Sequence, residues 1–230
     1  MKSALDAIRD RHSARAPFDP QRRITSHELA TLLDAARWAP TAHNMQNFEI
    51  VAIDDPDQLG ALGTIETRVT DAFLAENRTH VVGSIEELRA RGYGLLASAF
   101  PPAWLDPKTR AADLPPGRLA NVLRGAPLVL LVLFDAQDRS PGADRDGLMS
   151  LGCVLENLWL AADALGLAAQ MISSVANEAT AAAIRRVLGI PDHLAIAYAL
   201  RIGMPLAPTP TPRIRREIPV FVHHNRYGMS

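Results

Sequence analysis

The sequence contains little of what would place it at once in a specialised class of proteins. Cysteine occurs once in 230 residues, at Cys153, so no internal disulfide framework can form and a reducing compartment is expected. The longest apolar run, at residues 126–134, is far too short to span a bilayer. Residues 1–19 are charged throughout and lack the apolar centre of a signal peptide. We therefore expect a soluble, cytoplasmic, globular protein.

Several motifs of well-known sites are missing or out of place. The stretch GYGLLA at residues 92–97 matches the dinucleotide-binding pattern, but a charged helical segment precedes it where that motif requires a strand. The sequence has neither a P-loop nor a G-x-S-x-G motif. His223 and His224 are adjacent and cannot share one face of a strand, and no cysteine or carboxylate stands at ligand spacing. We expect no metal site, and neither nucleic acid nor membrane as a partner.

The chain does have an uneven distribution of charge. Its net charge is −1, yet residues 1–23 carry six cations against three anions, and residues 209–230 carry four arginines against one glutamate. Two basic ends on a nearly neutral chain suggest one anionic ligand held by both. Ends that are merely solvated would show the same pattern, so charge alone leaves both interpretations open.

Both basic ends place cationic side chains two residues apart. In RDRHSAR, Arg11, Ser13 and Arg15 would face one side of an extended segment that follows a helix. TPRIRRE repeats the arrangement with Arg213 and Arg215. Arginine forks and a hydroxyl suit the oxygens of a phosphate group. The alternative for Ser13 is a simple helix cap.

A second polar cluster lies within WAPTAHNMQNFEIVAI, residues 38–53, between a helical pattern and a strand pattern. We call residues 40–47 the polar junction. Its uncharged polar side chains outnumber the one or two that a plain turn needs. They are Thr41, His43, Asn44, Gln46 and Asn47, next to Pro40. The cluster favours contact with a polar but largely uncharged ring system, and a turn in which Asn44 bonds its own backbone is the alternative.

Hydrophobic periodicity predicts one α+β domain over residues 1–230, with a small central sheet and helices around it. Helices are expected at residues 3–11, 25–39, 56–67, 70–79, from 84 onward, 144–166 and 177–189. Strands are expected at residues 47–53, 126–136, 168–173 and 193–205. The proline-rich residues 100–120 show no periodicity and are expected to form a surface excursion or lid.

Five segments, in this order along the chain, resemble the nitroreductase family of flavin mononucleotide (FMN) enzymes. They are IRDRHSARAPFDP, LLDAARWAPTAHNMQNFEIVAI, SLGCVLENLWLAADALGLAAQMI, LGIPDHLAIAYALRIGMP and RREIPVFVHHNRYG. The chain departs from the family pattern at Asn47, where proline is usual, and at Ala168, where glycine is usual. Residues 66–120 match nothing in the pattern, and we interpret them as a variable helical or lid excursion.

The resemblance implies a nitroreductase-like fold, with a mostly antiparallel central sheet flanked by helices, and an intertwined homodimer with FMN at its interface. It implies that Arg15 reaches the N1–C2=O edge of the flavin, where a fixed cation stabilises the charge that reduction creates. The phosphate would be held by Arg11, Ser13, Arg213 and Arg215. The ring and ribityl chain would be lined, from the partner subunit, by Pro40, Thr41, Ala42 and Asn44. Further cofactor contacts are expected from His12, Gln46, Gln170 and Met171.

The activity implied by the resemblance is that of an FMN-dependent oxidoreductase. NAD(P)H would deliver a hydride and leave, and a nitroaromatic, a quinone or a related small-molecule acceptor would then take its place. Such ping-pong use of one site needs no catalytic acid or base from the protein. One alternative is a specialised flavin enzyme that dehydrogenates, dehalogenates or fragments a dedicated substrate. Another is a non-catalytic flavin-binding scaffold dimer. In each case the nearly all-apolar helix at residues 147–165 is expected to supply much of the dimer interface.

Overall fold

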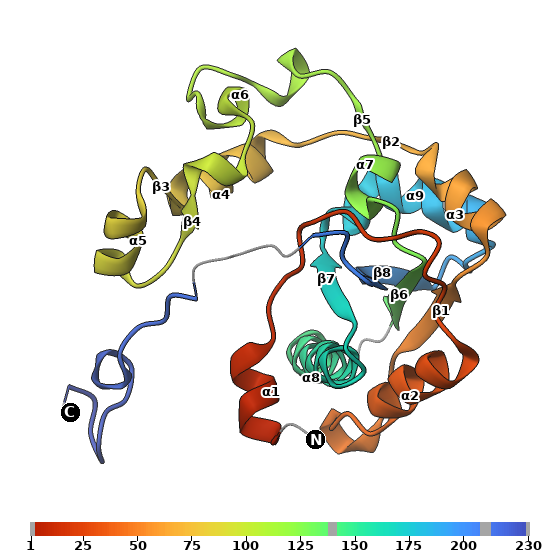
Figure 1. The fold of residues 1–230 in the computed structure, drawn as a ribbon, viewed down its shortest axis with the longest axis horizontal. Helices are drawn as coiled ribbons and strands as arrows, with labels where there is room; N and C mark the ends of the chain where they lie inside the picture. The colour runs from red at the N-terminus through yellow and green to blue at the C-terminus, as the bar shows by residue number, and fades with distance from the viewer. Residues whose placement is uncertain (1–2, 138–141, 208–212, 229–230) are drawn as a thin grey trace. The chain divides into compact units, whose positions relative to one another are not determined.

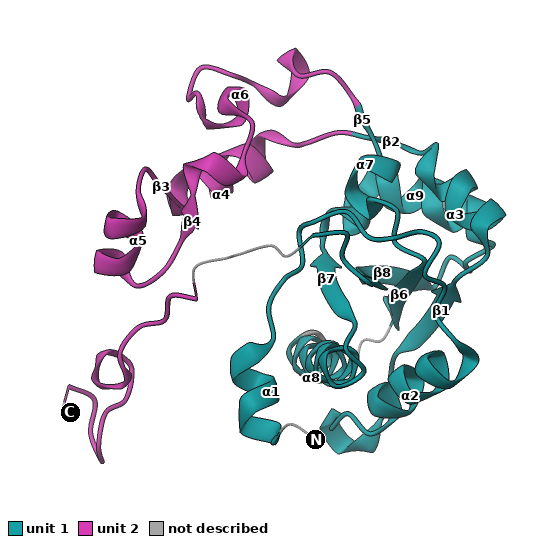
Figure 2. Cartoon of the chain, in the orientation of Figure 1, with its two compact units in different colours: residues 1–67, 117–209 teal, residues 68–116, 210–230 magenta. Residues whose placement is uncertain are grey.

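The computed structural model describes residues 3–137, 142–207 and 213–228, and the chain divides into two compact units (Figure 2). Unit 1 comprises Met1–Thr67 and Gly117–Thr209, and unit 2 comprises Arg68–Pro116 and Pro210–Ser230. The continuous part of unit 2 coincides closely with the excursion predicted for residues 66–120. That the whole chain is a single domain stays a prediction.

Unit 1 is built on a four-stranded sheet in which every neighbouring pair is antiparallel. In spatial order the strands are β1 (Glu49–Ile53), β6 (Leu128–Asp135), β8 (Leu194–Gly203) and β7 (Ala168–Ile172). Residues Leu128–Leu133 of the central strand β6 are all buried. This strand therefore reads as a continuous apolar run, because it is covered on both faces. The predicted antiparallel sheet is confirmed.

Helices cover both faces of this sheet (Figure 1). On one face, Leu128, Leu130 and Val132 of β6 pack with α2 (Ser26–Arg37) and α8 (Ala143–Ala164). Helix α1 (Ala4–Asp10) has no buried residue and contacts α8. On the other face, the alternate residues Val129 and Leu131 pack in a second core. Its helices are α3 (Pro56–Gly63), α7 (Ala120–Leu123) and α9 (Glu178–Leu188), with the 3-10 turn η4 (Ser174–Ala176).

The start of α2 shows why its sequence specifies a helix so well. Thr25 caps the helix: its hydroxyl accepts from the Glu28 backbone, and the Glu28 carboxylate accepts from the Thr25 backbone. Arg22 also donates to Glu28, at 2.6 Å. This side-chain hydrogen bond, with those from Thr25, lowers the pKa of Glu28 to about 2.

One predicted helix ends earlier in the structure than expected, and the structure supplies the end of another that was predicted only by its start. The helix expected over residues 56–67 ends at Gly63, and β2 (Glu66–Thr67) then pairs with β5 (Gly117–Arg118). The helix that starts after Ser84 is α5 (Ile85–Arg91), which ends at Gly92 in the left-handed conformation. Glycine adopts that conformation without steric cost, so it makes an efficient stop.

Unit 2 is a small assembly around half-buried aromatic side chains. The Phe73 ring meets the Trp104 ring edge-on at 5.6 Å between centroids, and Phe100 lies 6.5 Å from Trp104. Arg78 links α4 to the segment that follows Phe100, because it donates to the carbonyls of Trp104 and Thr109. The remaining elements are α4 (Asp71–His80), β3 (Val81–Val82), β4 (Leu95–Leu96), η2 (Ala97–Ala99), α6 (Pro102–Leu105), η3 (Ala111–Asp113) and η5 (Ile218–Val220). Among the described residues of both units, no helix is long and apolar enough to cross a bilayer.

Candidate functional site

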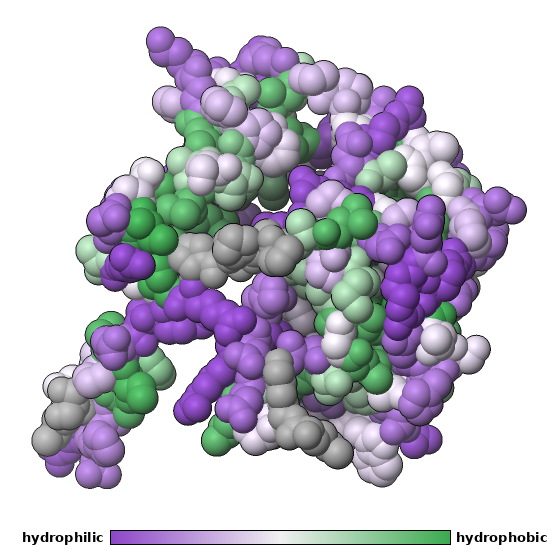
Figure 3. Space-filling model, in the orientation of Figure 1, coloured by the Kyte–Doolittle hydropathy of each residue, from purple (hydrophilic) through white to green (hydrophobic). Residues whose placement is uncertain are grey.

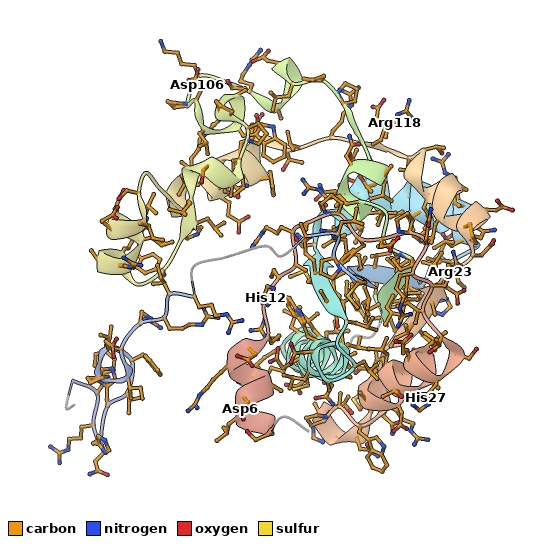
Figure 4. All side chains as sticks on the ribbon, in the orientation of Figure 1. Asp6, His12, Arg23, His27, Asp106 and Arg118 are labelled. Carbon is orange, nitrogen blue, oxygen red and sulfur yellow. The ribbon has the colours of Figure 1, made fainter. Side chains whose placement is uncertain are left out.

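The segment that follows α1 is extended, as predicted, and runs along strand β7. We call residues 11–16 the N-terminal arginine segment. Ser13 forms a parallel bridge with Ala169, and the Ala14 amide donates to the Ala169 carbonyl at 3.0 Å. Figure 4 labels His12 at the point where the chain leaves α1. The segment is thereby brought next to Gln170 and Met171, the two half-buried residues of β7 that were predicted as cofactor contacts.

Arg11 and His12 are both held against helix α8. The Arg11 guanidinium lies 4.6 Å from the centre of the Trp159 ring, and its Nε is 3.2 Å from a carboxylate oxygen of Glu156. That nitrogen is buried and makes no hydrogen bond, so its contact with Glu156 is an ion pair of poor hydrogen-bond geometry. Trp159 Nε1 donates to the His12 carbonyl at 3.2 Å. The predicted phosphate contact of Arg11 stays a prediction.

The carbonyl groups around Arg15 are held by two arginines that the sequence interpretation missed. Arg201 Nη2 donates to the carbonyls of Ala14 at 2.9 Å and Ala16 at 3.1 Å. Arg124 Nη1 donates to the Arg15 carbonyl at 2.6 Å. The Arg15 residue is exposed, so its backbone is fixed while its side chain faces solvent.

Arg201 itself is fully buried in strand β8. It also donates to the Leu123 carbonyl at 3.0 Å and, through Nε, to Oε1 of Gln170 at 2.8 Å. Burial, with a smaller contribution from the nearby charge of Arg124, lowers the pKa of Arg201 to about 10, so it remains a cation at neutral pH. The sequence did carry a signal for this residue: it is the only charged position in the otherwise apolar and aromatic run of residues 194–203.

The polar junction has an unusual backbone. His43, Asn44 and Gln46 have φ angles of 52°, 53° and 48°, in the left-handed region that non-glycine residues seldom adopt. Part of its polarity is satisfied locally, since Thr41 Oγ1 accepts from the Gln46 amide and Asn44 Oδ1 accepts from Gln46 Nε2. These bonds agree in part with the simpler interpretation of a self-bonded turn. Pro40, His43, Asn44 and Gln46 are nevertheless exposed, and strained backbone of this kind is concentrated at functional sites.

Helix α8 anchors the polar junction through a buried serine that the sequence interpretation also missed. The Ala42 amide, at the start of η1 (Ala42–Asn44), donates to Ser150 Oγ at 3.1 Å. Ser150 Oγ in turn donates to the Asp146 carbonyl at 2.7 Å. A serine in the first turns of a long apolar helix gives no sequence signal that it will meet a loop about a hundred residues away.

The two candidate regions of unit 1 do not converge within one chain. The polar junction contacts α8 at Ser150, whereas the N-terminal arginine segment contacts it at Glu156 and Trp159. At a rise of 1.5 Å per residue, Ser150 and Trp159 are roughly 13 Å apart along the helix. Figure 1 looks nearly along α8, with α1 and α2 on opposite sides of it.

The predicted C-terminal ligands lie in unit 2. Arg213 and Arg215 are exposed, and Arg215 donates to the neighbouring Ile214 carbonyl. Arg216 packs against Gly92, where an added Cβ would come within 3.1 Å of the Arg216 Cγ. That Arg213 and Arg215 share an anion with Arg11 stays a prediction.

The prediction that the helix at residues 147–165 offers its apolar surface to a partner subunit is wrong for much of that surface in α8. Leu151, Val154, Leu158, Trp159 and Ala162 are buried in the chain's own core. A helix between a sheet and two other helices is apolar on most faces for that reason alone.

Exposed hydrophobic side chains occur instead at the start of α8 and near the polar junction. Leu148 and Met149 are 71% and 66% exposed, and Trp38 and Met45 are 73% and 50% exposed. Hydrophobic side chains are also visible between hydrophilic ones on the face of the molecule shown in Figure 3.

Comparison with known proteins assigns the chain to a family. A model of the nitroreductase family matches residues 8–204. Protein DrgA of Synechocystis sp. is 29% identical over 163 residues, which are 70% of this chain and 67% of that protein. The FMN reductase (NADPH) of Bacillus subtilis is 22% identical over 231 residues, covering 100% of this chain and 76% of that protein. The chain belongs to the nitroreductase family.

Solved structures agree on the fold. A nitroreductase with bound FMN from Bacteroides fragilis aligns with a TM-score of 0.57 at 19% identity, over 94% of this chain and 96% of that one. The predicted resemblance is thereby confirmed over most of the sequence. The family match ends at residue 204, so the resemblance of residues 215–228 stays a prediction.

Proposed function

We propose that this protein is an FMN-dependent oxidoreductase that acts as a homodimer and takes its electrons from NAD(P)H. The observation that carries the proposal is the N-terminal arginine segment of this nitroreductase-family chain. Backbone pairing and arginine side chains hold that segment beside β7. Relatives support the cofactor, since one is named an FMN reductase (NADPH) and another was solved with bound FMN.

The residues present fit an anionic, partly aromatic cofactor. The Arg11 Nε is a buried donor that lacks a hydrogen-bond acceptor among the described residues, and Ser13 and Arg15 follow on the same extended backbone. Arginine forks and a hydroxyl match phosphate oxygens and polar ring edges. A phosphate bound here would compete with Glu156 for Arg11, so Glu156 would have to turn away or share the cation.

Each part of the chain then has a distinct task. Arg11 and Ser13, with Arg213 and Arg215, would hold the phosphate. The exposed Arg15 would place a positive charge at the edge of the ring, where it would stabilise the negative charge of the reduced form. Bound FMN would supply the hydride-accepting and hydride-donating chemistry, and the protein contributes binding, orientation and electrostatics.

The homodimer is supported by the separation of the two candidate regions. Helix α8 lies between the polar junction and the N-terminal arginine segment, so the junction of one protomer would complete the site of the other. The exposed Leu148, Met149, Trp38 and Met45 supply apolar surface near that junction. Such a group of exposed large side chains is typical of a protein–protein contact.

The test is a flavin spectrum of the purified protein under anaerobic conditions. We expect the apo-protein to take up FMN stoichiometrically, and the yellow complex to be bleached by NADH or NADPH and restored by a nitroaromatic or a quinone. Bound flavin that neither nicotinamide reduces would instead favour the specialised enzyme or the scaffold. Apo-protein that does not bind FMN would refute the proposal.

A further inference from the structure

Three consecutive backbone carbonyls, those of residues 14–16, accept hydrogen bonds from arginine side chains. Arg201 serves the first and third of them, and Arg124 serves the second. The amide of Ala14 is occupied as well, by the Ala169 carbonyl. The backbone around Arg15 is therefore bonded to β8, to β7 and to the end of α7. We call Arg201 and Arg124 the arginine clamp.

Burying the Arg201 cation costs free energy, so stability alone does not explain why the clamp contains it. Burying a cation is unfavourable unless its donors are satisfied, and replacing such a group by an apolar side chain is often tolerated. Among the described residues, the acceptors of Arg201 are all uncharged: three carbonyls and the Gln170 amide oxygen. The Arg201 guanidinium also lies 4.6 Å from the centre of the Phe18 ring. Ala199, two residues earlier on the same face of the strand, is a buried apolar residue of the core there.

The second arginine of the clamp stands in a backbone conformation that an arginine rarely adopts. Arg124 has φ 49° and ψ 48° and ends helix α7. The following Gly125, at φ 73°, packs so closely that an added Cβ would come within 2.9 Å of the Phe18 carbonyl. The Phe18 amide donates to the Arg124 carbonyl at 2.9 Å. The turn at residues 124–125 therefore contacts residues 15–18 through its backbone, at Phe18, and through the Arg124 side chain, at the Arg15 carbonyl.

We propose that Arg201 and Arg124 are positioning residues that hold the backbone of residues 14–16 in the conformation from which Ser13 and Arg15 contact the cofactor. The inference rests on the proposed function, because it names the residues that prepare the cofactor site. The clamp bonds only backbone atoms of residues 14–16. It therefore fixes the position of the Arg15 backbone and leaves the Arg15 side chain available to a ligand. Because Arg201 also donates to Gln170, the clamp connects that predicted cofactor contact to residues 14–16.

The first test measures the apo-protein and needs no flavin. Arg201→Met removes the buried fork while keeping an apolar side chain of similar length, and Arg124→Asn removes the exposed one while tolerating the left-handed backbone. We expect hydrogen exchange of peptides covering residues 12–18 to become at least about tenfold faster in Arg201→Met. The matched control is Arg185→Met, which removes an arginine that donates to the Pro191 carbonyl and to Asp192 elsewhere in unit 1. It should leave exchange at residues 12–18 unchanged.

The second test measures FMN. We expect the dissociation constant of oxidised FMN to rise about 10- to 100-fold in Arg201→Met and about 3- to 10-fold in Arg124→Asn, with wild-type affinity in Arg185→Met. Arg201→Lys keeps the charge but lacks the fork, so it should restore little of the loss. Lysine that restores affinity while exchange at residues 12–18 stays fast would show that charge, not position, is what matters, and would overturn the inference.

The third test asks whether the clamp acts through Arg15. The change in midpoint potential caused by Arg15→Gln should be smaller in the Arg124→Asn background than in wild type. The reason is that a mispositioned Arg15 already stabilises the reduced flavin less, so its removal changes the potential less. Equal changes in both backgrounds would contradict this route. If Arg201→Met does not fold, the exposed Arg124→Asn still decides. If the wild type binds FMN and the clamp variants keep wild-type FMN affinity and hydrogen exchange, the positioning role of the clamp is overturned and the proposed function stands. If the wild type fails to bind FMN, the proposed function is refuted as well.

Discussion

Substitution of Ser150 by alanine isolates the contact that anchors the polar junction to helix α8. The Ser150 hydroxyl accepts from the Ala42 amide at 3.1 Å and donates to the Asp146 carbonyl at 2.7 Å, and the residue is 3% exposed. Alanine keeps the helix and the volume nearly unchanged. The change therefore leaves the Ala42 amide without its acceptor and alters little else.

The expected magnitude follows from the burial of the two groups. An unsatisfied buried donor costs about 1–3 kcal/mol, and Ala42 is only half-buried, so water can replace part of the lost bond and about 1 kcal/mol is expected. The junction also holds three left-handed non-glycine residues, each of which costs on the order of 1 kcal/mol of strain. Once the anchor is lost, that strain favours rearrangement. If the strained form is the one that binds FMN, affinity should fall at least about fivefold.

Urea unfolding of the apo-protein and titration of oxidised FMN, both at one protein concentration, measure the two effects. Thr31→Ala is the matched control, because Thr31 makes the same kind of helix back-bond, to the His27 carbonyl at 2.9 Å, without holding a loop. It should change stability by less than about 0.5 kcal/mol and leave FMN binding intact. A Ser150→Ala variant that loses stability but keeps wild-type FMN affinity would refute the argument that the junction's conformation serves the cofactor.

Three further outcomes are expected. Arg15→Gln should lower the two-electron potential of bound flavin by a few tens of millivolts, where ~30 mV corresponds to ~1.4 kcal/mol, and change oxidised-FMN affinity much less; an unchanged potential would exclude the role proposed for this side chain. The double change of Arg11 and Arg213 to alanine should weaken FMN binding by ~10²–10⁴ in a folded protein, and full flavin retention would show that the two basic ends do not share an anion. Glu28→Gln should destabilise the protein most above about pH 4.5, because the lowered pKa of Glu28 adds stability that disappears as pH falls toward 2; a difference between the variants that stays constant from pH 6 to 3 would contradict this.

The sequence predicted the elements whose patterns are strong and local. Strand β6 was predicted from an unbroken apolar run and α2 from its hydrophobic periodicity. The N-terminal arginine segment was predicted to be extended because it follows a helix. Each of these depends on neighbours within a few residues, which is the range over which propensity and capping act. The helix expected over residues 56–67 was predicted too long, because residues 66–67 pair with a strand that lies about fifty residues further along the chain.

Contacts between distant segments were not predictable in the same way. The pairing of Ser150 with Ala42 and of Arg201 with residues 14 and 16 depends on how β8, α8 and the N-terminal segment pack in space. Periodicity identifies a buried face but not the backbone group that a polar residue on that face will meet. The apolar character of α8 was misleading for the same reason, since a helix covered by its own chain and one covered by a partner have the same sequence pattern.

The position of Arg201 shows how such contacts can be inferred from a sequence in part. A single charged residue inside a run of buried strand residues is unfavourable unless it is fully hydrogen-bonded, so its presence predicts acceptors close by even when their identity is unknown. In this chain two of the four acceptors are the carbonyls on either side of Arg15. A residue that would otherwise cost stability is instead committed to the backbone that presents a candidate cofactor ligand. The place where a sequence violates the apolar pattern of its core is therefore where a functional role should be sought first.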